Sequence, residues 1–238
     1  MRMRKKKNGE ERLRLCSEYL FSGEGQPMSD PAAALGYEGR EVWLEIGAGK
    51  GGFAVGMHKA NPEVVYFAME RVSDCVTLAA ELAKRENMPT SLRFVVDTAD
   101  NLTRLFANGS VDRIFLNFSD PWGKKGYAKR RLTHRRYLAV YMNLLKDGGS
   151  ITFKTDNVGL FDFSLEEISS MGLLPSAVTR DLHASEYNEG NVMTEYERAF
   201  SSEGIKINML RVVKPDGFMP EIEESLLPNR KNYRRENK

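Results

Sequence analysis

Glu45, Glu70 and Asp97 each stand at the end of a short apolar stretch of the sequence. Parallel strands place their carboxyl ends along one edge of a sheet, which is where open α/β proteins bind their ligands. We therefore expect the three carboxylates to share one rim. Carboxylates in that position can accept hydrogen bonds from the hydroxyl groups of a ribose or balance the charge of a cationic ligand.

A glycine-rich loop begins at the first of these acids. In the stretch EIGAGKGG, which starts at Glu45, Gly47, Gly49 and Gly52 satisfy the pattern GxGxxG, and Glu70 follows about 20 residues later. By pattern alone this is the fingerprint of a dinucleotide site, in which backbone N–H groups at the start of a helix hold a pyrophosphate. The loop lacks the Gly-Lys-Ser/Thr ending that is typical of nucleoside triphosphate sites.

Glu45 favours a different cofactor. A carboxylate that leads into the loop would lie near the pyrophosphate of a dinucleotide, and the two negative charges would repel each other. The same carboxylate suits a cationic ligand without phosphate, such as S-adenosylmethionine with its sulfonium and α-amino groups. We expect Glu70 to accept hydrogen bonds from the ribose hydroxyls and Asp97 to face the adenine. Two alternatives stay open: a nicotinamide-dependent oxidoreductase, or a helix cap at Glu45 with a surface acid at Glu70.

A fourth acid, Asp120, lies near the start of SDPWGKKGYAKRRLTHRR (119–136), directly after the apolar residues 111–118. Methyltransferases of exocyclic amines carry an Asp/Asn-Pro-Pro-aromatic turn at such a place, whereas here a single Pro121 precedes Trp122. N7 of a purine has an in-plane lone pair and no proton, so methyl transfer to it needs no general base. Asp120 is then expected to orient a guanine and to balance the positive charge that moves onto its ring.

Basic residues are concentrated in three segments, although the net charge of the chain is only +2. Residues 1–7, 120–137 and 228–238 together hold 17 of the 35 basic residues and 2 of the 33 acids. Clustered Lys and Arg side chains are favoured where a surface meets a polyanion, because phosphate contacts release counterions. The distribution predicts a polyanionic partner, although either terminal segment alone is equally typical of a solvated tail.

Short apolar stretches alternate with helical patterns from about residue 41 to residue 170. Strands are expected at 42–46, 64–69, 92–96, 111–118 and 150–155, and helices at 53–60, 74–86, 135–146 and 159–171. This alternation predicts an α/β fold with a doubly wound, mostly parallel sheet and helices on both faces.

Two turn signals complete the predicted topology. DGG at 147–149 is expected to end the helix over 135–146. Beyond residue 190, EYERAFSS (195–202) and IKINMLRVV (205–213) are expected to form two strands around the tight turn EG. Such an antiparallel β-hairpin would close one edge of the sheet.

The overall composition indicates a single soluble domain with short extensions. At 238 residues the chain is long enough for one good core. No apolar run approaches the ~20 residues of a membrane span, and no apolar stretch follows the basic start as in a secretory signal. Cys16 and Cys75 show no metal-type spacing, which favours reduced thiols. We expect a cytoplasmic monomer or homodimer with no metal and no membrane partner.

Two later motifs have simple structural interpretations. In FKTDN, Asp156 and Asn157 occupy positions where the N-cap of a helix is expected. In TEYE, Thr194 and Glu197 have the spacing of a capping box or of a cross-strand pair. On pattern alone these interpretations are favoured over a role in binding.

Four stretches taken together resemble the bacterial tRNA (guanine-N7-)-methyltransferase family. They are EIGAGKGGF, DPWGKKGYAKRRL, FKTDN and TEYERAF, in this order and at compatible spacing over about 42–213. The resemblance implies a Rossmann-like class I methyltransferase fold, S-adenosyl-L-methionine as donor and a guanosine in the variable loop of tRNA as target. The expected parts are a basic and polar N-terminal extension (1–40), the methyltransferase domain (41–215) and a basic C-terminal tail (216–238).

The resemblance also implies roles for individual residues, and Asp120 is the implied catalytic acid. The cofactor set is Glu45, Gly47, Gly49, Glu70, Asp97 and Asp120; the substrate set is Lys124, Asp156, Thr194, Glu195, Tyr196 and Glu197; the RNA-contacting stretch is Gly126, Tyr127, Ala128, Lys129, Arg130 and Arg131. Family members usually carry Arg-His where this chain has Gly126-Tyr127, and Tyr127 offers a ring for stacking on a base instead. A methyltransferase for another base position and a non-catalytic RNA-binding adaptor remain as alternatives.

Overall fold

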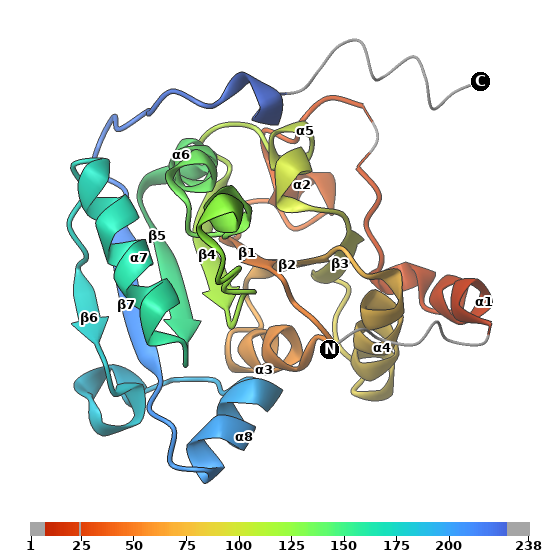
Figure 1. The fold of residues 1–238 in the computed structure, drawn as a ribbon. Helices are drawn as coiled ribbons and strands as arrows, with labels where there is room; N and C mark the ends of the chain where they lie inside the picture. Colours follow the sequence, from red (N-terminus) through yellow and green to blue (C-terminus); the bar gives the residue numbers. More distant parts are fainter. Residues whose placement is uncertain (1–7, 24, 228–238) are drawn as a thin grey trace.

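The computed structural model describes residues 8–23 and 25–227, so the basic segments 1–7 and 228–238 lie outside the described residues. Seven strands form one sheet in the order β3-β2-β1-β4-β5-β7-β6 (Figure 1). Their bounds are β1 Val42–Ile46, β2 Val65–Glu70, β3 Leu92–Val96, β4 Val111–Asn117, β5 Leu145–Thr155, β6 Ala177–Thr179 and β7 Asn208–Val213. The predicted positions of the first four strands are therefore confirmed to within one residue at each end.

The sheet is mostly parallel, as predicted. Strands β1 to β5 pair in parallel, while β7 pairs antiparallel with both β5 and β6. The strand order reverses at β1, because β2 lies on one side of it and β4 on the other. In open α/β sheets, ligands bind outside the carboxyl ends of the strands at such a reversal. The sheet therefore places its crevice between the loops that follow β1 and β4.

Helices cover both faces of the sheet (Figure 1). The α-helices are α1 Gly9–Arg14, α2 Pro31–Ala34, α3 Gly52–Ala60, α4 Ser73–Arg85, α5 Leu102–Leu105, α6 Arg135–Leu144, α7 Val158–Ser170 and α8 Glu195–Ser202. The 3-10 turns are η1 Ser17–Tyr19, η2 Ala99–Asn101, η3 Lys125–Arg130, η4 Leu182–Ala184, η5 Glu186–Asn188 and η6 Glu224–Leu226.

Two large cores follow from the alternation of side chains along β1. Leu44 and Ile46 pack in one cluster with apolar residues of α5, α6 and α7. Trp43 points to the opposite face and packs with residues of α3 and α4. A third, smaller cluster around Ile207 and Met209 fixes the segment that leads to β7. Glu45 has the same parity as Trp43, so the sheet directs its side chain beneath α3.

Residues 195–202 form the helix α8, so the prediction of a strand there was wrong. Thr194 and Glu197 make both hydrogen bonds of a capping box, which starts the helix at Glu195. Strand β7 instead pairs antiparallel with β5 and β6, both of which lie far earlier in the chain. The antiparallel edge was predicted correctly, but it is built without the expected tight turn.

The prediction that DGG ends a helix was also wrong in detail. Helix α6 stops at Leu144, and β5 begins at the next residue and runs through DGG. Gly148 has φ 79°, and a Cβ on Gly149 would lie 2.8 Å from the carbonyl oxygen of Asp112. The glycines therefore allow an irregular start of the strand, where its pairing with β4 shifts register.

Residues 214–227 form a strap that crosses α6 and ends at η6 (Figure 1). Asn143 donates a hydrogen bond to the carbonyl oxygen of Pro220 (2.8 Å), and Thr103 donates one to that of Leu226 (2.6 Å). Leu226 is 2% exposed and packs in the core with α5 and α6. A basic tail was predicted over 216–238, whereas the strap carries four acids and no base after Lys214.

Three further findings concern only the part of the chain that the structure describes. None of its helices is long and apolar enough to cross a membrane. It contains no group of three or more His, Cys, Asp or Glu residues placed to hold a metal ion. Neither Cys16 nor Cys75 belongs to a disulfide there, and Cys16 is buried.

Candidate active site

The glycine loop connects β1 to α3 at the reversal point of the sheet. Gly47 and Gly51 have φ values of 85° and 78°, in the left-handed region that favours glycine. A Cβ on Gly51 would lie 2.6 Å from that of Ala79 on α4, so only glycine permits this close packing. The backbone N–H of Gly49 donates a hydrogen bond to Glu70 (3.1 Å), which ties the loop to the end of β2.

Glu45 is 2% exposed and lies beneath this loop. Its Oε1 accepts a hydrogen bond from Nδ2 of Asn117 (3.2 Å), at the end of β4. Its Oε2 and the Oδ1 of Asn117 are buried acceptors to which no donor of the described residues is well aligned, although the buried hydroxyl of Tyr66 lies close enough to lower the pKa of Glu45. Burial raises the pKa of Glu45 to about 7, against the hydrogen bond from Asn117 and the positive charge of Lys154. Buried acceptors of this kind indicate a donor at this place, such as an ordered water or a cationic group of a ligand.

Sequence reasoning did not single out Asn117. The available signal was a polar residue at the end of the apolar run IFLN, directly opposite the strand that carries Glu45. A buried amide without a partner for its oxygen is a rare feature and indicates a ligand or a water at that atom.

Glu70 and Asp97 lie at the carboxyl ends of β2 and β3, as expected. Glu70 also accepts a hydrogen bond from the backbone N–H of Val72 (2.9 Å), so each of its two carboxylate oxygens is hydrogen-bonded to a backbone N–H group. Oδ1 of Asp97 accepts hydrogen bonds from the backbone N–H of Thr98 and from the side chain of Asn101, both at 2.7 Å. The two carboxylates thus shape the loops around the crevice.

Asp120 lies in a turn of unusual backbone geometry. Phe118 and Trp122, on either side of it, have φ values of 51° and 42°. Such angles are uncommon outside glycine and cost about 1–3 kcal/mol each, and they cluster at functional sites. The carboxylate of Asp120 is exposed and lies 3.7 Å from Arg71, which follows β2. The pair spans the carboxyl end of β1, which lies between β2 and β4.

Arg131 braces this turn. Its Nε and one Nη donate hydrogen bonds to the carbonyl oxygens of Pro121 (2.9 Å) and Trp122 (3.2 Å). Its guanidinium also lies 4.3 Å from the ring centre of Phe163 on α7. The turn is therefore held from one side by a planar group with several donors.

Asp156 lies beside the same turn, at the carboxyl end of β5. The backbone N–H of Phe118 donates a hydrogen bond to the carbonyl oxygen of Lys154 (2.9 Å), which joins the two loops. Asn157 caps α7 by accepting a hydrogen bond from the N–H of Leu160 (2.8 Å). The predicted cap is thus made by Asn157, and Asp156 is left half-buried at the rim.

Thr194 and Glu197 belong to a buried polar network. Glu197 is fully buried, and its carboxylate accepts hydrogen bonds from Lys154 (2.6 Å), Asn191 (2.7 Å) and His183 (3.0 Å). Burial by itself raises the pKa of Glu197, but the charge of Lys154 and these hydrogen bonds outweigh it and hold the pKa below its usual value. Lys154 is 3% exposed, so the ion pair ties β5 to the start of α8.

The first turn of α8 lies against the glycine loop. Nζ of Lys50 is 3.5 Å from a carboxylate oxygen of Glu195, and a Cβ on Gly52 would lie 3.7 Å from the side chain of Glu195. Tyr196 is 62% exposed. Of the four predicted substrate residues in TEYE, the middle two therefore face outward at the crevice, while the outer two hold the helix in place.

The basic residues after Asp120 divide into two groups. Arg131, Arg135 and Arg136 are engaged with other parts of the fold: Arg135 with Glu167 on α7 (2.9 Å) and Arg136 with Asp100 in η2 (2.7 Å). The other four are exposed: Lys124, Lys125, Lys129 and Arg130. Within the described chain, no acid lies within 4.0 Å of any of their charged groups. They form the free part of the predicted RNA-contacting stretch, together with Gly126, Tyr127 and Ala128.

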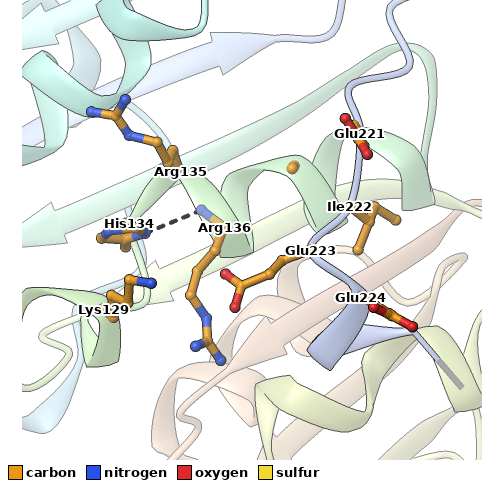
Figure 2. Close-up of a pocket in the computed structure, with 9 residues that line it drawn as sticks. Lys129, His134, Arg135, Arg136, Glu221, Ile222, Glu223 and Glu224 are labelled. Atoms are coloured by element: carbon orange, nitrogen blue, oxygen red, sulfur yellow. Dashed lines mark hydrogen bonds between the residues drawn. The ribbon is translucent and has the colours of Figure 1, made fainter. Parts of the chain in front are cut away.

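A hollow of about 440 Å³ lies outside the crevice, between the start of α6 and the strap. Figure 2 shows Lys129, His134 and Arg136 on one side of it and Glu223 of the strap beside Arg136. The nearby positive charges of Arg136, Lys129 and His134 contribute to the lowered pKa of Glu223, after its hydrogen bond from Ser225. The strap thus limits the basic surface on this side.

Comparison with known protein families identifies the class of protein to which this site belongs. The model of a family described as putative methyltransferases matches residues 39–210, which is most of the chain. The chain belongs to this family. The match contains the glycine loop, the Asp120 turn, FKTDN and TEYE, and it sets aside the nicotinamide-dependent oxidoreductase.

Solved structures with the same fold are also methyltransferases. The 16S rRNA methyltransferase KamB has a TM-score of 0.58 at 13% identity, over 83% of this chain and 99% of its own. An antibiotic-related methyltransferase has a TM-score of 0.54 at 18% identity, over 79% and 95%. Geranyl diphosphate C-methyltransferase from Streptomyces coelicolor A3(2) has a TM-score of 0.51 at 15% identity, over 87% and 98%. At these identities the likeness concerns the fold, which is that of class I methyltransferases.

The chain is thus a methyltransferase that uses S-adenosylmethionine, as sequence analysis predicted. The residues present fit this cofactor on structural grounds. The buried acceptors on Glu45 and Asn117 suit a cationic group, and the loop at Gly49 lacks the Gly-Lys-Ser/Thr ending of a phosphate-binding loop. A dinucleotide would place a negatively charged pyrophosphate beside Glu45, whereas S-adenosylmethionine places positively charged groups there.

Proposed function

We propose that this protein transfers the methyl group of S-adenosylmethionine to N7 of a guanosine in the variable loop of tRNA. The observation that carries the proposal is the exposed carboxylate of Asp120, held at the crevice in a braced turn and followed by four exposed basic residues. The four sequence motifs of the tRNA (guanine-N7-)-methyltransferase family support the choice of substrate.

The donor would be held by side chains at the ends of β1 to β4. Glu45 and Asn117 offer two acceptors to its α-amino group, and Glu70 is placed for the ribose hydroxyls once it releases the loop. Asp97 stands beside the expected adenine position, and Gly47 and Gly49 let the backbone approach closely. S-adenosylmethionine supplies an electrophilic methyl group bound to a sulfonium.

Asp120 has an orienting role in this scheme. N7 of guanine attacks with its own lone pair, so no proton has to leave the base during transfer. The Asp120 carboxylate can accept hydrogen bonds from the N–H groups on the guanine edge and can balance the charge that appears on the purine ring. The ion pair between Asp120 and Arg71 must separate for this contact to form.

The remaining predicted residues would place the tRNA. Glu195 and Tyr196, at the start of α8 beside the glycine loop, and Lys124 and Asp156, in the loops after β4 and β5, would contact the nucleoside. Thr194 and Glu197 act through the position of α8. Lys129 and Arg130 are free for phosphate contacts, whereas Arg131 also braces the Asp120 turn.

The direct test is methyl transfer from labelled donor to unmodified tRNA, followed by mapping of the product nucleoside. N7-methylguanosine in the variable loop is the expected product. Another methylated base would refute the choice of atom, and binding of donor and tRNA without any transfer would point to an RNA-binding adaptor. A tRNA with adenosine in place of the target guanosine is the matched control and should accept no label.

A second candidate is transfer to another base position in RNA. It is favoured by the fold shared with KamB, whose name specifies 16S rRNA. The single proline in DPW speaks against an exocyclic amine as acceptor. Parallel reactions with tRNA and rRNA, with the same product mapping, separate the two candidates.

A further inference from the structure

Trp122, Tyr127 and Arg130 form a compact cluster at the mouth of the crevice. The rings of Trp122 and Tyr127 meet edge to face, with centroids 6.0 Å apart and an interplanar angle of 78°. The guanidinium carbon of Arg130 lies 5.0 Å from the ring centre of Trp122 and 4.7 Å from that of Tyr127. Three flat groups are therefore assembled within one short loop.

The cluster is open to solvent. Tyr127 is 41% exposed and Trp122 is partly exposed, whereas the other tryptophan, Trp43, is 3% exposed in the core. Arg130 is exposed, and no acid of the described chain lies within salt-bridge distance of it. Exposed rings beside an uncompensated cation do not stabilise a core, and such groups are typical of surfaces that bind single-stranded nucleic acid.

The loop holds these groups in place before any ligand arrives. Trp122 sits in a left-handed conformation, and Arg131 donates hydrogen bonds to the carbonyl oxygens of Pro121 and Trp122. A stacking surface that is already ordered loses little conformational entropy on binding. The unfavourable backbone conformation of Trp122 thus serves to fix its ring in place for binding.

We propose that Trp122, Tyr127 and Arg130 form a stacking platform for an unpaired nucleobase that flanks the target base of the RNA substrate. The platform rests on the proposed function in that Asp120 marks the position of the target. Trp122 lies two residues beyond Asp120, so their Cα atoms are at most about 7 Å apart. A base that presents its edge to Asp120 leaves its neighbour without a stacking partner, and the platform replaces that partner.

Stacking makes the platform tolerant of base identity. Every base has a π face, so a ring pair with a guanidinium favours an unpaired base over a paired one without selecting its type. Lys124, Lys125 and Lys129 lie beside the platform and supply the contacts to phosphates. The surface is therefore built for a locally unstacked strand and not for the backbone of a regular duplex.

Tryptophan fluorescence tests this proposal directly, because the chain has only two tryptophans. The probes are a short single-stranded oligoribonucleotide and its abasic analogue, added at raised salt to weaken phosphate contacts. We expect saturable quenching by the base-containing probe and none by the abasic one. In Trp122→Phe, which keeps Trp43, the quenching should vanish.

Variants at Tyr127 give a second measurement, by fluorescence anisotropy of a labelled probe. Tyr127→Ala should weaken binding of the base-containing probe about tenfold, and Tyr127→Phe should keep wild-type affinity because the ring remains. Arg130→Lys keeps the charge but loses the planar group, and we expect it to lie between the two. Thermal unfolding checks that every variant is folded.

The outcomes separate this proposal from the proposed reaction. If the oligonucleotide binds without quenching Trp122, or if Tyr127→Ala binds as well as Tyr127→Phe, the platform is refuted even where N7 of tRNA is methylated. If quenching and the loss in Tyr127→Ala are seen while no N7-methylguanosine forms, the platform stands and the proposed reaction falls.

Discussion

Asp120 combines exposure, a single arginine partner and a braced turn. We predict that Asp120→Ala lowers kcat of methyl transfer at least about 100-fold, because the guanine loses its orienting acceptor and the ring its counter-charge. Donor affinity should change less than about tenfold, as measured by calorimetry. Asp162→Ala is a matched control, since Asp162 is also exposed and paired with one arginine, Arg180, at 2.6 Å. Full activity of Asp120→Ala would remove the residue from the mechanism.

Glu45 makes donor binding depend on pH. Its pKa of about 7 means that the unliganded protein holds a proton that the unfolded chain loses near pH 4.5, so this group's contribution to stability falls as pH rises through that window. A cationic group beside Glu45 lowers the pKa again, and binding then releases a proton.

We therefore predict that donor affinity rises with pH between about 6 and 8. Calorimetry in two buffers of different ionisation enthalpy measures the proton released on binding. In Glu45→Gln the release should disappear and the affinity should no longer vary over this range. Equal proton release in the wild type and the variant would contradict the assignment.

Helix α8 depends on the buried ion pair between Lys154 and Glu197. We predict that Lys154→Met destabilises the protein by about 3–5 kcal/mol, because it leaves the Glu197 carboxylate buried without its cation. Urea unfolding measures the loss. The control is Lys146→Met, whose ammonium lies 2.9 Å from Asp112 but is 46% exposed, and which should cost less than about 1 kcal/mol.

A double variant tests the cause of this loss. Adding Glu197→Gln to Lys154→Met removes the unpaired charge, so part of the stability should return. If Lys154→Met and Lys146→Met have equal effects, the buried pair does not hold α8.

Elements with a clear apolar pattern were predictable from sequence: β1 and β3 as short, largely apolar runs and α4 as an amphipathic helix. Residues 195–202 were not, because a short amphipathic segment fits either period and only the capping box at Thr194 and Glu197 decides for the helix. At the site, Glu70 and Asp97 could be found from their positions after apolar runs. Asn117 could not, because its importance arises from an unpaired oxygen beside Glu45, a contact across two strands.

The strap illustrates a second limit of sequence reasoning. Its acids and prolines resemble a polar tail, and its order comes from Leu226 in a core formed by distant elements. Likewise, the sequence does not distinguish Arg131 from the other basic residues of its stretch. Its role depends on hydrogen bonds to the carbonyl oxygens of Pro121 and Trp122, which only the structure shows. Long-range partners, and not local propensity, determine both.

At the scale of the molecule, RNA affinity should depend on salt through the exposed bases. We predict that Lys125→Ala combined with Lys129→Ala lowers the slope of log affinity against log salt by about 1.4–1.8, as for two lost phosphate contacts. Arg131 is left intact because it braces the Asp120 turn. Filter binding of tRNA over a salt series measures the slope.

A pair of bases elsewhere serves as the control for this measurement. Arg180 and Lys206 are exposed and bound to acids at 2.6 Å and 3.0 Å. Their joint replacement by alanine removes the same charge from the protein and should leave the salt slope unchanged. A wild-type slope in the Lys125 and Lys129 variant would place the RNA on another surface.

The position of β7 between β5 and β6 has a consequence for synthesis of the chain. While a ribosome has delivered only the residues before Asn208, β5 keeps an unpaired edge and β6 has no neighbour. Open edges recruit strands from other chains, and domains begin to fold from the N-terminus during translation. Translation arrest or proteolysis ahead of this strand would thus yield an aggregation-prone fragment, although that fragment holds the whole glycine loop and the Asp120 turn.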